Sequence, residues 1–207
     1  MMRSIQERIL SDKLSERILW LSIAFFLVFF GATILSFYIL PEGFLLGKNR
    51  IANFRTSENL FLCAVQIFLY NMLSVSVIFF GSAFAKRKEG EKVCVSYGLL
   101  GFFVFILLNA VTLGTWSFTA NPNSVPLASR LLRTFDIVHN AGLLEMYGQL
   151  LITSALATKY LVITEGKKVS TRNISEIPIS KAEILTLILG FLLMFAGALV
   201  ESRAIIG

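Results

Sequence analysis

The first long apolar stretch begins at Ile18, ends at Leu40 and reads ILWLSIAFFLVFFGATILSFYIL, without a single charged residue. An α-helix rises about 1.5 Å per residue, so about 20 apolar residues cross the roughly 30 Å hydrocarbon core of a bilayer. Four further apolar stretches of similar length follow at Asn59–Phe84, Val93–Phe118, Gly142–Ile163 and Ile184–Val200. The sequence therefore predicts an all-α polytopic membrane protein with five transmembrane helices.

The composition leaves no room for a separate soluble domain. Of the 207 residues, 56% are hydrophobic and only 15% are charged, which is far from the balance of soluble proteins. We expect residues 1–17 to form a cytoplasmic amphipathic arm and residues 18–207 to form one five-span membrane domain. An enzyme with an ordinary soluble fold is excluded, so any chemistry must come from residues within or beside the helices.

The formal net charge of +6 is interpreted as a sign of topology rather than of nucleic-acid binding. Thirteen of the 19 Lys and Arg residues lie in the N-terminal arm, in the loop after the second stretch and in the segment after the fourth. Cytoplasmic loops carry the excess of Lys and Arg in membrane proteins. The pattern predicts a multi-pass protein of the cytoplasmic membrane, with the N-terminus inside and the C-terminus outside.

Several polar side chains fall inside the apolar stretches, where an unsatisfied polar group costs several kcal/mol, on the order of a lost hydrogen bond or more. They could join helices by hydrogen bonds, or they could line a polar cavity or substrate path. The candidate intramembrane residues are Gln66, Asn71, Asn109, Glu145, Gln149 and Glu201.

Glu145 and His139 are the only weak candidates for catalysis. They are six residues apart, so they would not share a face of one continuous helix, but they could meet if a helix begins after Asn140. A structural carboxylate that bonds neighbouring helices is the alternative for Glu145. A single His cannot supply a multi-His metal site, and no catalytic motif accompanies it. We expect no cofactor, no metal and no enzymatic activity.

The basic loops are candidate docking surfaces for anionic lipid or for a partner protein. Their side chains are Lys86, Arg87, Lys88, Lys92, Lys167 and Lys168. Glycines also recur within the apolar stretches, where small residues allow helices to approach closely. They are Gly81, Gly98, Gly101, Gly114, Gly148, Gly190 and Gly197.

Four short motifs resemble those of the stage II sporulation protein M family. The segment Ile67–Val75 resembles its F-x-x-N-x-x-x-A signature, and Asn109–Gly114 resembles its N-G-x-x-L-G turn. Gly142–Glu145 resembles its H-G-x-x-E box, and Ala198–Glu201 its terminal A-x-x-E. The motif Ala is Val75 here, the motif Gly is Ala110, and the motif His falls at Ala141, two residues after His139. The order of the motifs and the five-span layout agree over residues 18–202.

The resemblance implies a membrane scaffold or assembly subunit that recruits partner proteins, since members of the family recruit peptidoglycan-degrading partners during spore engulfment. Similar proteins in circular-bacteriocin gene clusters imply the alternative: maturation, export or immunity for a hydrophobic peptide, with a cytoplasmic ATPase as partner. An intramembrane hydrolase that uses His139 and Glu145 is the third hypothesis. The expected partners are the bilayer, other membrane proteins and further copies of the chain, and not nucleic acid.

Overall fold

The computed structural model describes residues 5–46, 57–90, 93–118 and 123–207, and these residues are mostly helical. They form seven α-helices, one 3-10 helix and four short strands. In chain order the elements are α1 (Ile5–Ile9), α2 (Leu14–Ile39), α3 (Leu60–Ser82), β1 (Phe84–Arg87), β2 (Cys94–Ser96), α4 (Tyr97–Gly114), α5 (Leu127–Arg133), α6 (Gly142–Leu156), β3 (Val162–Glu165), β4 (Lys168–Thr171), η2 (Ile174–Glu176) and α7 (Lys181–Ile206).

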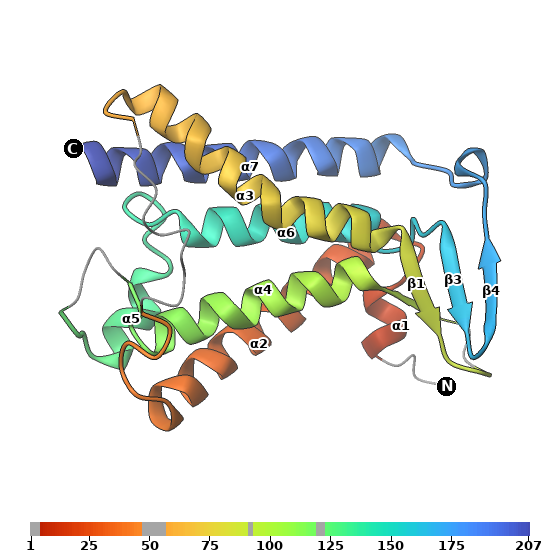
Figure 1. Ribbon diagram of the computed structural model, residues 1–207, viewed down its shortest axis with the longest axis horizontal. Coiled ribbons are helices and arrows are strands. Elements are labelled where there is room, and N and C mark those ends of the chain that lie inside the picture. The colour runs from red at the N-terminus through yellow and green to blue at the C-terminus, as the bar shows by residue number, and fades with distance from the viewer. Residues whose placement is uncertain (1–4, 47–56, 91–92, 119–122) are drawn as a thin grey trace.

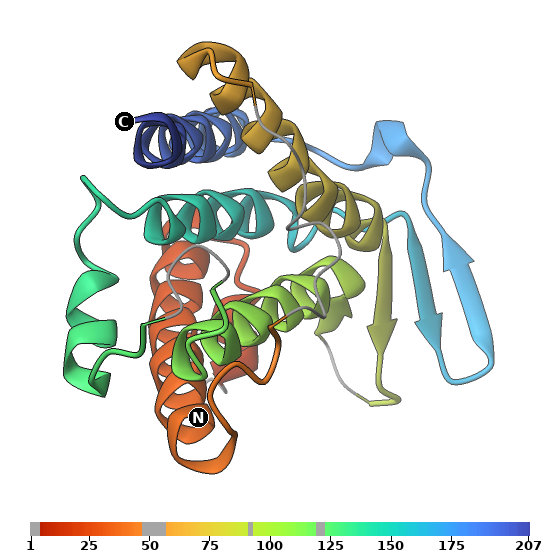
Figure 2. The same cartoon turned by 60° about the vertical axis from the view of Figure 1, so that its left-hand side comes forward.

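The five longest helices form a bundle in which consecutive helices run in opposite directions (Figure 1). Helix α6 lies between α7 and α3 on one side and α2 and α4 on the other (Figure 2), and it contacts all four. The strands and α1 lie at one end of the bundle, which we name the sheet end. The end of the bundle that holds α5 and the C-terminus is named the far end.

Four helices are long and apolar enough to cross a membrane: α2, α3, α4 and α7. Many of their large apolar side chains are exposed, including Leu27 at 70%, Phe80 at 69% and Leu185 at 66%. A soluble monomer rarely exposes so much contiguous apolar surface, whereas lipid covers it without cost. These helices indicate a membrane protein.

Helix α6 differs from the transmembrane helix expected at Gly142–Ile163. It contains 15 residues and ends at Leu156, which corresponds to about 22 Å of rise. Every residue from Gly148 to Leu156 is buried. The expected span was too long because residues 157–163, which are mostly apolar apart from Thr158 and Lys159, form a turn and the start of β3. The helix is a short core element surrounded by the others.

The boundaries of the other helices follow local chemistry. The side chains of Asn59, Ser96 and Ser180 cap α3, α4 and α7 by accepting hydrogen bonds from backbone N–H groups in the first turn. Such caps satisfy donors that lack a partner within the helix. Helix α2 begins at Leu14, so Arg17 belongs to the first long helix and not to a surface arm. Residues 1–4 of the expected arm lie outside the described residues.

A four-stranded sheet at the sheet end corrects the prediction of an all-α fold. Its strand order is β2-β1-β3-β4, with β1 antiparallel to β2, β1 parallel to β3 and β3 antiparallel to β4. Ala85, Cys94 and Ile163 form its buried cluster, against which Tyr160 packs. Strands of three or four residues carry too little periodicity to be read from sequence, and β1 and β3 are joined only by the tertiary fold.

Candidate functional site

The candidate site within the apolar helices lies where α3, α6 and α7 meet. The Asn71 side-chain amide on α3 donates a 2.6 Å hydrogen bond to a carboxylate oxygen of Glu145 on α6. On α7, a Cβ added to Gly197 would lie 2.7 Å from Cγ of Glu145, so this glycine leaves room for the carboxylate side chain. Glu201 follows Gly197 one helical turn later on α7, so the two residues share a face of this helix. Three helices thus place polar groups at one junction.

The remaining predicted intramembrane residues lie elsewhere. Gln66 accepts a 2.8 Å hydrogen bond from the backbone N–H of Ser57. Asn109 is exposed and donates to the carbonyl oxygen of Phe105 in its own helix. Gln149 is buried in α6, and its side-chain oxygen has no hydrogen-bond partner within the described residues. The six residues therefore do not line one shared path.

His139 and Glu145 are not joined by any hydrogen bond in the described structure. The His139 ring nitrogen Nδ1 lies 3.0 Å from Asp136 in the connection between α5 and α6. This hydrogen bond lowers the pKa of the Asp136 carboxyl below its usual value. Glu145 instead bonds Asn71. The arrangement offers an interhelical hydrogen bond at Glu145 and a surface hydrogen bond between His139 and Asp136, and not an acid–base pair.

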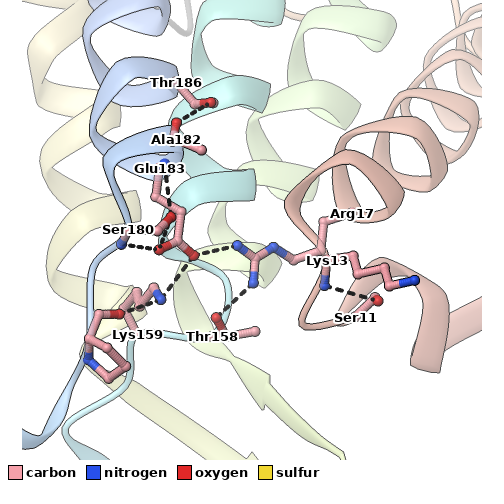
Figure 3. A network of polar contacts seen from close by, with 10 residues as sticks. Ser11, Lys13, Arg17, Thr158, Lys159, Ser180, Ala182, Glu183 and Thr186 are labelled. Atoms are coloured by element: carbon pink, nitrogen blue, oxygen red, sulfur yellow. Dashed lines mark hydrogen bonds and ion pairs between the residues drawn. The ribbon is translucent and has the colours of Figure 1, made fainter.

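A buried polar network at the sheet end was missed by the sequence analysis. The Arg17 guanidinium on α2 is 1% exposed, and it donates to a Glu183 carboxylate oxygen on α7 at 2.6 Å and to the Thr158 hydroxyl at 2.8 Å. Lys159 contacts the same Glu183 oxygen at 2.9 Å (Figure 3). Figure 3 shows that α2, α7 and the segment after α6 all converge on this carboxylate.

The sequence contained a partial signal for this network. Ser180 and Glu183 form a capping box, in which the serine hydroxyl accepts from the Glu183 backbone N–H and the glutamate bonds the Ser180 backbone N–H. This S-x-x-E pattern at a helix start is recognisable in sequence. Arg17 lies 166 residues away along the chain, and only the structure shows that it donates a hydrogen bond to the glutamate of this capping box.

A second buried arginine lies at the far end. Arg130 is fully buried and donates to the backbone oxygens of Gly114 and Val125 and to the carboxylate of Glu42. Ser124 also donates to Glu42. The hydrogen bonds from Ser124 and then Arg130 lower the pKa of the Glu42 carboxyl. This cluster ties the loop after α2 to the end of α4 and the start of α5.

The predicted docking residues gather on the sheet. Lys86 and Arg87 lie in β1, Lys167 in the turn between β3 and β4, and Lys168 in β4. The Arg87 guanidinium donates a 2.5 Å hydrogen bond to the Glu165 carboxylate, and this hydrogen bond raises the pKa of the guanidinium. Lys86, Lys88, Lys167 and Lys168 are exposed. We name these four lysines the basic platform. Lys92 lies outside the described residues.

A cavity of about 510 Å³ opens at the far end among α2, α4, α6 and the α5–α6 connection. Its lining contains Asn109 and His139 among the predicted residues, together with Phe29, Trp116, Arg133 and Met146, which the sequence analysis did not single out. Within the described ranges, no group of three or more His, Cys, Asp or Glu side chains gathers in a way that could hold a metal ion.

Comparison of the chain with protein-family models, with curated proteins and with solved structures gives no match.

Proposed function

We propose that the protein is a multi-pass scaffold of the cytoplasmic membrane, of the stage II sporulation protein M type, that recruits a partner protein through the basic platform. Asn71, Glu145 and Glu201 come from three of the four motifs that suggested this family, and their convergence at one junction supports a shared architecture. In this role the junction holds three helices together, because a hydrogen bond between helices has few competitors in lipid.

The proposed orientation places the sheet end in the cytoplasm and the C-terminus outside. The described Lys and Arg residues support it, because eleven of them lie at the sheet end and three at the far end. Cytoplasmic segments carry this excess in membrane proteins. With α6 counted as a short fifth crossing through the bundle core, the two termini lie on opposite faces.

The pairing of β1 with β3 is the observation that carries the proposal. It joins two loops, which are separated along the chain by α4, α5 and α6, into one sheet, with Lys86 opposite Thr164 in the parallel register. Arg87 and Glu165 form an ion pair within the sheet, and the four platform lysines are exposed. An exposed surface rich in lysine favours a partner that presents acidic side chains.

Site-specific photo-cross-linking tests the proposal. A photoreactive amino acid at Val169, an exposed position in β4, leaves every platform lysine in place. In native membranes we expect one discrete protein adduct, which mass spectrometry identifies. The double variant Lys167→Glu/Lys168→Glu should lose this adduct. The control variant Lys13→Glu, which reverses an exposed charge at the same end but off the sheet, should retain it.

Two outcomes would overturn the proposal. Adducts with lipid alone would show that the platform binds the membrane surface. Equal loss in the Lys13→Glu control would show that total charge, and not the sheet, governs recruitment.

A cytoplasmic ATPase as the identified adduct would instead favour the second candidate function, in which the chain serves maturation or export of a hydrophobic peptide. The observation that favours this candidate is the buried, unpartnered oxygen of Gln149 within the bundle.

A further inference from the structure

The far-end cavity has an apolar floor and a polar rim. Phe29 and Met146 belong to the buried core of the bundle, at 2% and 5% exposure, and both line the cavity. Arg133, His139 and Asn140 line it from the α5–α6 connection. The cavity volume of about 510 Å³ lies within the usual range for small-molecule sites. An occupant that fits both parts must be apolar at one end and polar at the other.

The rim carries one guanidinium without a carboxylate partner in the described structure. Arg130 on the preceding turn is engaged by Glu42, and His139 is engaged by Asp136. Arg133 forms no ion pair with any described residue, although it lines the cavity. An arginine in this position favours an anionic oxygen group, and phosphate suits its planar set of donors.

Two amides add neutral hydrogen-bonding capacity beside this charge. Asn140 donates one N–H to the carbonyl oxygen of Arg133, and Asn109 donates one to the carbonyl oxygen of Phe105. A primary amide has two N–H donors and one acceptor oxygen. Within the described structure, each amide therefore keeps one N–H donor and its acceptor oxygen available to an occupant of the cavity.

Trp116 is held at the cavity in a backbone conformation that bulky residues rarely adopt. It has a φ of 50°, and it stands directly after α4, where the Ser117 backbone N–H bonds the carbonyl oxygen of Thr112. Glycine is the usual residue at this position of a helix end. Strained backbone of this kind concentrates at ligand sites. The indole packs against Phe118 and Arg130 while it lines the cavity.

The side chains beside the rim indicate whether the occupant comes from the membrane or from water. Leu132 near the end of α5, and Phe135 and Val138 in the α5–α6 connection, are 72%, 55% and 71% exposed. Large apolar side chains exposed beside a helix end suit the membrane interface and not open water. We propose that the cavity binds one anionic phospholipid, with its phosphate at Arg133 and the rim amides and one acyl chain along Phe29, Leu143 and Met146.

Native mass spectrometry of the purified full-length protein in detergent tests this assignment. The probes are phosphatidylglycerol and phosphatidylcholine with identical chains, and inorganic phosphate. We expect one retained phosphatidylglycerol, bound about tenfold more tightly than phosphatidylcholine. Both lipids carry the phosphate, but the choline ammonium of phosphatidylcholine partly neutralises it and brings a second positive charge beside Arg133. Arg133→Gln should remove the preference. Arg203→Gln, an exposed arginine at the same end that does not line the cavity, should retain it. Leu143→Trp should fill the cavity and reduce the retention of both lipids.

Equal retention of the two lipids by the unaltered protein would overturn the proposal. So would equal losses in Arg133→Gln and Arg203→Gln, since they would show a diffuse charge effect. Displacement of phosphatidylglycerol by inorganic phosphate at an equal concentration would show that the site recognises a soluble anion without the acyl chain, which also refutes a lipid site. Arg133 is exposed, so its substitution tests binding without disturbing the fold.

Discussion

The contact between α6 and α7 is one of the close helix crossings at which a single added methyl group tests the packing of the bundle. A Cβ at Gly148 would lie 2.6 Å from the backbone oxygen of Gly190 and 2.6 Å from Cγ of Met194. A carbon and a carbonyl oxygen in contact are ordinarily about 3.3–3.6 Å apart. The variant Gly148→Ala therefore forces the two helices apart locally, because the backbone of Gly190 cannot rotate away as a side chain can.

The expected change in the free energy of unfolding follows from two opposing effects. Extra atoms in a well-packed core cost about 1–3 kcal/mol. Alanine gains up to about 1 kcal/mol over glycine within a helix. Gly31→Ala on α2 is the matched control, because a Cβ there would meet nothing within 4 Å. The free energies of unfolding of the two variants should therefore differ by about 1–3 kcal/mol, with Gly148→Ala the less stable.

The assay is thermal or SDS-induced unfolding in one detergent. For a domain of this length, about 1 kcal/mol shifts Tm by roughly 2–4 °C, so we expect the two variants to melt roughly 2–12 °C apart. The double variant Gly148→Ala/Gly190→Ala should cost less than the sum of its parts, because one separation of the helices relieves both contacts. If Gly148→Ala is as stable as Gly31→Ala, the close packing of α6 against α7 is wrong.

Three further predictions concern charge and topology. Glu183→Gln leaves Arg17 buried without its counter-charge, so we expect a loss of about 3 kcal/mol in the free energy of unfolding, measured by SDS titration; an unchanged midpoint would contradict the network. The folded-state pKa of Glu42 is lowered, so the stability that its bond with Arg130 contributes is present above the unfolded pKa and disappears as pH falls through the folded pKa. The Tm advantage of the unaltered protein over Glu42→Gln should therefore shrink as the pH falls below the ordinary pKa of a glutamate, about 4.3, and an advantage that grows as the pH falls would contradict this prediction. Finally, protease added to intact cells should remove a C-terminal tag and spare an N-terminal tag; cleavage of both or neither would refute the proposed orientation.

The sequence predicted the helical part of the fold well where the signal is local. The apolar stretches at Asn59–Phe84 and Val93–Phe118 contain α3 and α4, and the stretch at Ile18–Leu40 covers α2 except for its first turn. The same reasoning overestimated the fourth span. Residues 157–163 are apolar enough to extend it, but the backbone turns after Leu156 to enter the sheet.

The candidate site was predicted in part. Asn71 and Glu145 were recognised as costly polar groups within apolar stretches, and the structure joins them. Arg17 and Arg130 were counted only as loop charges, yet both are buried. The sequence could not identify them, because the burial of an arginine depends on partners that approach from distant helices, as Glu183 does.

The sequence by itself determined that this chain is mostly helical and suited to lipid. Helical hydrogen bonds join residues four apart, and the hydrophobic effect acts on each stretch separately, so both leave a record along the chain. The tertiary structure alone decided that β1 pairs with β3, that α6 is a short core helix, and that Glu145 meets Asn71. These contacts join residues more than 70 positions apart, and their energy exists only after the helices have packed.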